Sequence, residues 1–425
     1  MSQFSYQDGV LHAESTSLSS IATQFGTPTY VYSKAGLLSN FHAYADACQG
    51  RDALVCYAMK ANSNLAILDL LAREGAGFDI VSAGELQRVL AAGGDPAKVI
   101  FSGVGKSAAE MRLALSHDIL CFNVESIPEL HRLNDVAGEV GKRARVSLRV
   151  NPNVDAKTHP YISTGLKANK FGVAYDDAVA TYQAAAALPN LDVAGVDCHI
   201  GSQLLDDAPL LESLDRMIDL IDTLRGLGIE LHHLDMGGGL GINYGDGEPV
   251  PTADYVSRVF ARVDAWRAEK YDGAPIKVIF EPGRSIVGDT GVLLTSVEYL
   301  KPGEEKNFCI VDAAMNDMIR PALYQAWMDV KPLKQAGAAE EALTYDVVGP
   351  VCESGDWLAK DRDLAVAPGD VLAIMQAGAY GFAMASNYNT RGRPAEVMVD
   401  GGKVHVVRAR ENPAELFVLE KVLGD

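Results

Sequence analysis

Eight short apolar runs, rich in Val, Ile, Cys and Phe, alternate with longer segments through the first two thirds of the chain. The longer segments repeat apolar residues every three or four positions, which is typical of helices that pack by one face. This alternation favours a parallel sheet, and eight repeats in about 230 residues fit a closed (β/α)8 barrel better than an open sheet. The predicted strands are ALVCYA, FDIV, VIF, LCFNV, RVSLRV, VAGVDCHI, LHHLDM and KVIFE, and the predicted helices include residues 65–74, 83–92, 178–188, 209–225 and 254–268.

The texture of the sequence changes after Arg284. From there, short β-like runs are separated by Pro-Gly, Gly-Asp and Gly-Gly turn pairs, which predicts a second, mainly β domain. The runs VLH and TYVYS near the start of the chain look similar and are expected to add strands to it. We therefore predict an α/β chain with a (β/α)8 TIM barrel at residues 33–284 and a β domain formed by residues 1–32 and 285–425. The β-like runs are VLLTSVEYL, FCIV, YDVVG, VLAIM, AEVMV and VHVVRA.

Charge and hydrophobic pattern narrow the classes of partner. The 56 Asp and Glu residues outnumber the 37 Lys and Arg residues, and the formal charge of −19 repels phosphate backbones and anionic lipids. The longest run without Gly or polar residues, Ala53 to Met59, has seven residues. A membrane-spanning helix needs roughly 18. We therefore predict neither a nucleic-acid partner nor a membrane partner.

Two further features bear on location. No Lys or Arg precedes Lys34, so the basic start of an export signal is missing. The six cysteines include no C-x-x-C pair, which argues against a cysteine metal site or a redox pair. A reduced, cytoplasmic set of thiols and no bound metal is the simplest interpretation.

Polar residues with catalytic potential follow the predicted strands, and the active site of a (β/α)8 barrel lies at the C-terminal ends of its strands. Lys60 follows the first strand, His199 the sixth, Gly237–Gly239 the seventh and Glu281 the eighth. A lysine at this position can hold an aldehyde cofactor as a Schiff base, and a Gly-rich turn can bind phosphate through backbone N–H groups. Pyridoxal phosphate carries both groups, so the sequence predicts this cofactor.

The motifs that carry these residues resemble a known family. YAMKAN (57–62), HIGSQ (199–203), the glycines at 237–239 and EPGR (281–284) resemble the signature set of the alanine-racemase-like, fold-type III pyridoxal-phosphate decarboxylases. The resemblance covers nearly the whole chain. It implies pyridoxal phosphate as the cofactor, an amino acid as the substrate and a homodimer as the assembly.

Three motifs of the C-terminal third point to one branch of that family. MNDMIRPALY (315–324), GPVCESGD (349–356) and AYGFAMASNYN (379–389) most closely resemble the branch that acts on meso-2,6-diaminopimelate. The resemblance implies decarboxylation of this diamino acid to L-lysine and carbon dioxide, the last step of lysine biosynthesis.

The resemblance also assigns roles to individual residues. Lys60 is expected to form the Schiff base, and Glu281 to keep the pyridine nitrogen protonated so that the ring accepts electrons. Cys352 is expected to reprotonate the α-carbon from the partner subunit. Asp79, Glu85 and Arg149 match positions near the cofactor, with their roles left open. The cofactor-binding residues implied are Lys60, His199, Ser202, Gly237, Gly238, Gly239, Glu281 and Tyr388.

The far end of the substrate sets a charge requirement. Diaminopimelate ends in a second carboxylate and a second ammonium, so a selective pocket needs cationic and anionic groups together. Arg284 and Arg320 can bind the carboxylate through planar bidentate hydrogen bonds. Glu353 can bind the ammonium, with Tyr324 and Tyr388 lining the pocket.

Other functions of the same fold remain as alternatives. An ornithine- or arginine-type decarboxylase typically has Asp after the cysteine, where this chain has Glu353, and lacks the run at 320–324. An alanine racemase is disfavoured because Glu281 favours a strongly electron-withdrawing ring. A non-catalytic pyridoxal-phosphate-binding homologue would have lost Lys60 or Cys352, and both are present.

Overall fold

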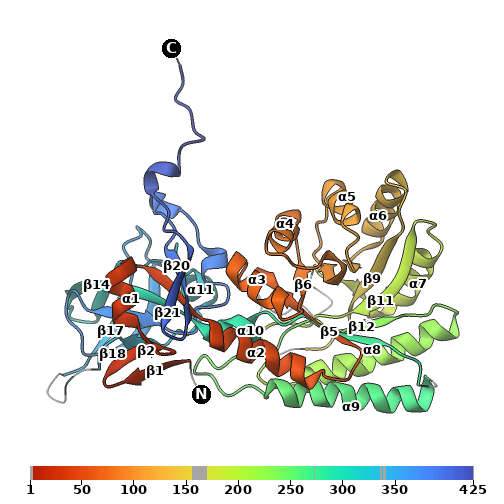
Figure 1. The fold of residues 1–425 in the computed structure, drawn as a ribbon, viewed down its shortest axis with the longest axis horizontal. Helices are drawn as coiled ribbons and strands as arrows, with labels where there is room; N and C mark the ends of the chain where they lie inside the picture. Colours follow the sequence, from red (N-terminus) through yellow and green to blue (C-terminus); the bar gives the residue numbers. More distant parts are fainter. Residues whose placement is uncertain (1–2, 156–169, 272, 336, 338–340, 425) are drawn as a thin grey trace. The chain divides into compact units, whose positions relative to one another are not determined.

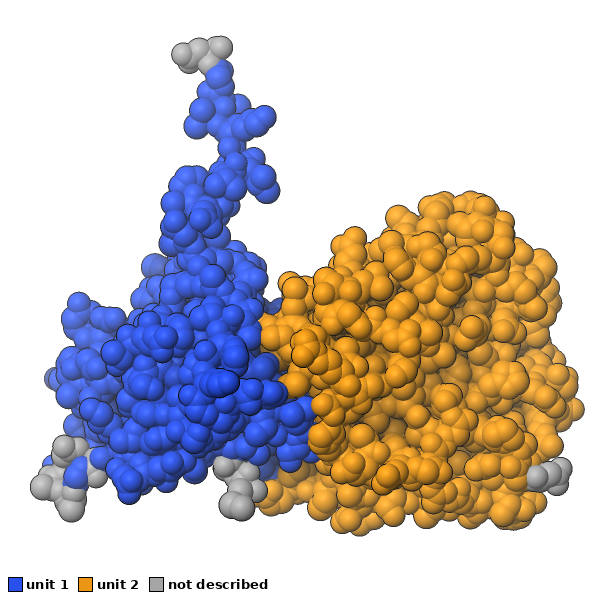
Figure 2. All heavy atoms as spheres, viewed as in Figure 1, with its two compact units in different colours: residues 1–39, 243–247, 286–425 blue, residues 40–242, 248–285 orange. Residues whose placement is uncertain are grey.

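A computed structural model describes residues 3–155, 170–271, 273–335, 337 and 341–424. The chain divides into two compact units (Figure 2). The barrel unit comprises Asn40–Ile242 and Glu248–Ser285, and the β unit comprises Met1–Ser39, Asn243–Gly247 and Ile286–Asp425.

The barrel unit is built on eight parallel strands that close on themselves (Figure 1). Each strand pairs in parallel with the next, and the last pairs with the first. A two-residue strand, β10 (Val173–Ala174), pairs in parallel with the end of one of them. All eight strands predicted from the sequence are confirmed. They are β5 (Ala53–Ala58), β6 (Gly77–Ile80), β7 (Val99–Phe101), β8 (Cys121–Val124), β9 (Ala144–Asn151), β11 (Leu191–Asp197), β12 (His233–Asp235) and β13 (Lys277–Phe280).

These strands read as continuous apolar runs because both of their faces are covered. The short strands β6, β7 and β8 are buried at every position. Inward-pointing side chains fill the barrel, where Cys56, Ile100 and Ile279 form one packed cluster. The barrel interior is therefore a solid core, and binding sites are confined to its ends.

Helices connect the strands and pack around them (Figure 1). Serine side chains accept hydrogen bonds from the first turn of three of these helices, at Ser82, Ser107 and Ser126, so the loops after the strands stop at defined residues. No helix of the described residues is long and apolar enough to cross a membrane. The helices of this unit are α3 (Leu65–Arg73), α4 (Ala83–Ala91), α5 (Ala108–Ser116), α6 (Ile127–Glu139), α7 (Tyr175–Ala186), α8 (Ala208–Gly226) and α9 (Thr252–Lys270), while α2 (Lys34–Ala47) and α10 (Arg284–Val287) span its borders with the β unit.

The β unit combines both ends of the chain, as predicted. One interior strand is the N-terminal β4 (Thr29–Ser33), which pairs antiparallel with β14 (Gly291–Lys301) and parallel with β20 (Ala395–Asp400). All five residues of β4 are buried. The other strands of this sheet are β15 (Asn307–Val311), β16 (Val330–Pro332), β17 (Leu343–Val348), β18 (Trp357–Leu364), β19 (Val371–Ile374) and β21 (Lys403–Arg408), and a small sheet holds β1 (Phe4–Gln7), β2 (Val10–Ala13) and β3 (Thr16–Ser17), followed by α1 (Leu18–Phe25).

Close packing between neighbouring barrel strands makes a testable prediction at Gly195 on β11. A Cβ atom added there would lie 2.0 Å from Nε2 of His233, its partner on β12. We expect Gly195→Ala to destabilise the fold by about 1–3 kcal/mol, because the packed histidine has to shift.

The matched control is Gly226→Ala at the end of α8, where an added Cβ meets nothing within 4 Å. Thermal unfolding midpoints measure both variants. Gly195→Ala should melt several degrees lower than the parent protein, and Gly226→Ala at the same temperature or slightly higher. Equal midpoints for the two variants would contradict the packing argument.

Candidate active site

Lys60 lies directly after β5, in the short helical turn η1 (Met59–Ala61). Its Nζ donates a hydrogen bond to Oδ2 of Asp79 on the neighbouring strand β6, at 2.7 Å. The Asp79 side chain is fully buried, whereas 37% of the Lys60 side chain is exposed. A buried carboxylate therefore orients an amine that remains accessible to a reactant.

The glycine loop after β12 is a point of close backbone contact. An added Cβ at Gly237 would lie 2.4 Å from the carbonyl oxygen of Cys198, and one at Gly238 would lie 2.4 Å from that of Glu281. At Gly239 the same atom would lie 2.8 Å from the carbonyl oxygen of Gly201. Only glycine allows the loops after β11, β12 and β13 to approach this closely. The glycines of the predicted phosphate loop are therefore also required for the packing of these loops.

The glycine loop also fixes the tautomer of His199. The backbone N–H of Gly238 donates to its Nδ1 at 3.2 Å, so the ring hydrogen of the neutral form lies on Nε2. Burial, with help from the charges of Arg149 and Lys60, lowers the pKa of His199 well below its usual value. The residue therefore presents an uncharged, flat ring, which suits the predicted stacking on the cofactor.

Ser202 and Arg284 lie together, although 82 residues separate them in the sequence. Nε and a terminal nitrogen of the buried Arg284 donate to Oγ of Ser202 at 3.3 and 3.1 Å. Arg284 was predicted to bind substrate and Ser202 to bind phosphate. In the structure they form one pair, which offers a cation and a hydroxyl to the same anion.

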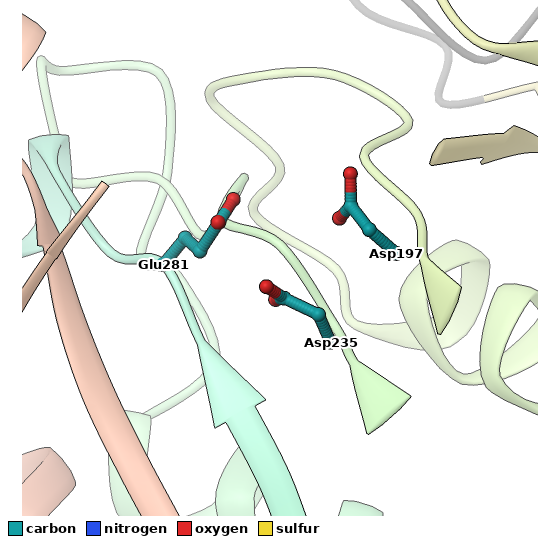
Figure 3. Close-up of side chains that lie close together, drawn as sticks. All are labelled: Asp197, Asp235 and Glu281. Carbon is teal, nitrogen blue, oxygen red and sulfur yellow. The ribbon is translucent and has the colours of Figure 1, made fainter. Parts of the chain in front are cut away.

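A buried carboxyl cluster lies at the ends of β11, β12 and β13 (Figure 3). The cluster consists of Asp197, Asp235 and Glu281, and one carboxyl oxygen of each lies within 4.8 Å of the other two. Each has one buried oxygen without a hydrogen-bond partner, and the backbone N–H of Gly237 donates to Asp235 at 2.9 Å. Sequence reasoning singled out Glu281 only, because nothing local shows that the other two face it.

Burial and mutual repulsion keep protons on this cluster. Burial raises the pKa of Asp235 to about 7. Burial first, and then repulsion by Asp235, raise the pKa values of both Asp197 and Glu281 well above their usual values. The cluster therefore holds protons at neutral pH, next to the position that the sequence assigns to the cofactor ring.

Arg149 and Glu85, whose roles the sequence left open, form hydrogen bonds with neighbouring loops of the site. Arg149 on β9 donates to Glu125 and to the carbonyl oxygen of His199, both at 3.4 Å, and its guanidinium lies 4.8 Å from the ring of Phe171. Glu85 accepts a hydrogen bond from the backbone N–H of Val81 at 2.6 Å. Arg149 thus anchors the backbone that carries His199.

The β unit carries a second group of predicted residues. Cys352 is the exposed cysteine of the six, and the other five are buried. Its backbone N–H donates to the side chain of Asn389 at 3.2 Å, and the hydroxyl of Tyr388 donates to Glu353 at 2.5 Å. Both Asn389 and Thr390 adopt left-handed backbone conformations, with φ of 55°. These hydrogen bonds connect the loop that carries Cys352 to the loop that carries Tyr388 and Asn389. Asn389 is a residue that sequence reasoning missed.

Arg320 and Tyr324 begin and end the short helix α11 (Arg320–Tyr324). Arg320 is buried, and its guanidinium lies 4.4 Å from the ring centre of Tyr244. A terminal nitrogen also lies 3.4 Å from the sulfur of Met328. These contacts fix the direction of the guanidinium within the β unit, and Tyr244 is a second residue that the sequence did not reveal.

The comparisons with known proteins agree with this geometry. The family model described as "Pyridoxal-dependent decarboxylase, pyridoxal binding domain" matches residues 35–288. The fold and the site therefore define a pyridoxal-phosphate-dependent carboxy-lyase.

More specific relatives cover the whole chain. The diaminopimelate decarboxylases of Pseudomonas aeruginosa and Vibrio cholerae are 60% and 57% identical, each over 100% of both chains. The crystal structure of the M. jannaschii diaminopimelate decarboxylase with L-lysine has a TM-score of 0.93 at 38% identity, over 100% of this chain and 99% of that one. The corresponding Helicobacter pylori complex has a TM-score of 0.88 at 44% identity, over 95% and 98%. The chain belongs to the diaminopimelate decarboxylase family.

The residues present fit pyridoxal phosphate, the cofactor of this family. The accessible amine of Lys60 suits its aldehyde, and the Arg284–Ser202 pair suits its phosphate. The unpartnered buried oxygen of Glu281 suits the ring nitrogen, which can complete its hydrogen bonding.

The carboxyl cluster predicts a pH dependence of stability in the protein stripped of cofactor. The pKa of Asp235 rises from 3.8 to about 7 on folding, so the folded form binds this proton more tightly than the unfolded form does. The resulting stabilisation is complete below pH 3.8 and is lost as the pH rises through about 7.

We expect Asp235→Asn to reduce this loss by up to about 1.4 kcal/mol per pH unit between pH 4 and 7, since one titrating proton is removed. Asparagine keeps the acceptor for Gly237. Urea unfolding across this range measures the effect, and exposed Asp192→Asn is the control. Parallel curves for Asp235→Asn and the parent protein would show that Asp235 is ionised throughout.

Proposed function

We propose that this chain decarboxylates meso-2,6-diaminopimelate to L-lysine and carbon dioxide, on pyridoxal phosphate held by Lys60. The observation that carries the proposal is the Lys60–Asp79 pair, which presents an accessible amine at the catalytic end of the barrel. Membership of the diaminopimelate decarboxylase family, with full-length relatives at 50–60% identity, supports the choice of substrate.

The barrel residues prepare the cofactor. When bound, pyridoxal phosphate supplies an electron sink for the pair released as carbon dioxide leaves. Lys60 binds its aldehyde carbon, with Asp79 directing the amine, and Arg284 with Ser202 and the glycine loop binds its phosphate. Neutral His199 covers the ring face and excludes water from it. Glu281 holds a proton at the ring nitrogen, which strengthens the sink.

The residues of the β unit complete the reaction. The thiol of Cys352 gives a proton to the α-carbon after the carboxylate has left. The hydrogen bond from the Cys352 backbone to the Asn389 side chain fixes the direction of the Cys352 loop. Arg320 binds the distal carboxylate of the substrate, while Glu353 and the Tyr388 hydroxyl bind its distal ammonium. These roles follow from the chemistry of each group and from its place in the family motifs.

The assembly we propose is a homodimer in the cytoplasm. Cys352 is exposed on the β unit, which supports its use in the site of a partner subunit. None of the six cysteines forms a disulfide, which agrees with a reducing compartment.

Substrate choice is tested by carbon dioxide release from meso-diaminopimelate, L-lysine and L-ornithine, each supplied alone. We expect turnover of lysine and ornithine to be lower by roughly 10⁴ or more, because neither has the distal carboxylate and Arg320 would be left without its anionic partner. Arg320→Ala should impair diaminopimelate turnover strongly, with the visible spectrum of the bound cofactor unchanged. Turnover of ornithine at a comparable rate would instead favour the ornithine-type alternative.

Sharing of the site is tested by mixing two inactive variants. Lys60→Ala lacks the cofactor lysine and Cys352→Ala lacks the proton donor, so random mixed dimers regain one intact site in two. We expect activity to reappear after subunit exchange, at up to about a quarter of the parent value for equal mixtures, since half of the dimers are mixed. Absence of recovery after exchange, verified with tagged chains, would show that each chain completes its own site.

A further inference from the structure

The last residues of the β unit form an extended arm. After β21 and a single turn, η6 (Pro413–Glu415), residues 416–424 continue without a helix or strand. Figures 1 and 2 show this C-terminal arm, residues 412–424, leaving the body of the β unit. The arm therefore makes few contacts with the unit to which it is attached.

The arm exposes large apolar side chains to water. Five of the seven residues from 417 to 423 are apolar and exposed, from 52% for Phe417 and 69% for Val418 to 93% for Leu419, 94% for Val422 and 100% for Leu423. Single exposed apolar residues are ordinary, but a contiguous group of large ones marks an interaction surface. Elsewhere on the β unit an exposed aromatic residue such as Trp327 is at least covered by a cation, Arg362, 3.3 Å from its ring centre.

The root of the arm is hydrogen-bonded to the segment that contacts the Cys352 loop. Glu411 accepts hydrogen bonds from the side chain of Asn387 at 2.8 Å and from the side chain of Arg393 at 3.1 Å. Asn387 immediately precedes Tyr388 and Asn389, the two residues that hold Glu353 and Cys352. Residues 387–389 therefore connect the root of the arm to the Cys352 loop.

We propose that the C-terminal arm packs its apolar side chains against a second copy of this chain, beside the site that receives Cys352. This inference rests on the proposed homodimer. Because the arm is connected to the Cys352 loop, the molecule that covers the arm has to be present where Cys352 acts. The partner subunit that receives Cys352 is such a molecule, so no further component is needed. A twofold dimer provides two arms by symmetry, each reinforcing the placement of its own Cys352 loop.

The first test compares three holoenzymes by sedimentation velocity and by activity over a range of protein concentrations. The arm variant Leu419→Glu/Val422→Glu/Leu423→Glu places charges on the proposed contact. The control Glu420→Gln/Lys421→Gln changes polar residues of the same arm. We expect the arm variant to dissociate at least tenfold more readily than the parent and to lose activity on dilution, and the control to match the parent.

The outcomes separate this inference from the function it rests on. An arm variant that dissociates and dilutes like the parent overturns the inference and leaves the homodimer intact. A lowered melting temperature with unchanged association would place the arm on its own chain, which also overturns it. A parent protein that is monomeric and fully active would contradict the homodimer itself.

A second measurement does not depend on how well the variants fold. A photoreactive amino acid at Leu423 is irradiated in a mixture of two differently tagged holoenzyme chains after subunit exchange. Crosslinks between the two tags support the inference, and crosslinks confined within one chain refute it. Capture of any other protein is impossible in this purified mixture, so every product reports on this chain alone.

Discussion

Closure of eight parallel strands is the constraint on which the rest of the barrel unit depends. Because all strands run in one direction, the residue that follows each strand reaches the same rim. Lys60, Asp79 and Glu281 come from different parts of the sequence, yet each lies within two residues of the end of a strand, or on it. The crowding this produces is relieved by glycine in the loop after β12.

The same crowding decides the charge state of the site. Carboxyl groups at three neighbouring strand ends cannot all ionise in a buried space, and burial likewise keeps His199 neutral. The carboxyl cluster and His199 therefore carry less charge than their residue types would have in water. Paired titratable groups whose pKa values are displaced in this way are common in catalytic centres, where protons have to be held in place during a reaction.

Most of the fold could be predicted from local sequence patterns. The barrel strands were predictable because each is buried on both faces and therefore apolar throughout, and their helices showed a regular period. Strand β18 was missed because its sequence, WLAKDRDL, is half charged and gains its place from pairing with β17. The site residues that lie in motifs could also be predicted from the sequence. The approach of Asp197 and Asp235 to Glu281 could not, because it depends on tertiary structure. The same holds for the contact of Arg320 with the ring of Tyr244.

The position of β4 inside the large sheet of the β unit has a consequence for synthesis of the chain. This buried strand is made early, but both of its pairing partners, β14 and β20, follow only after the entire barrel unit. During translation the TYVYS segment waits as an unpaired, apolar edge while the barrel forms behind it. Strand β4, made before the barrel, is therefore among the last strands to find its neighbours.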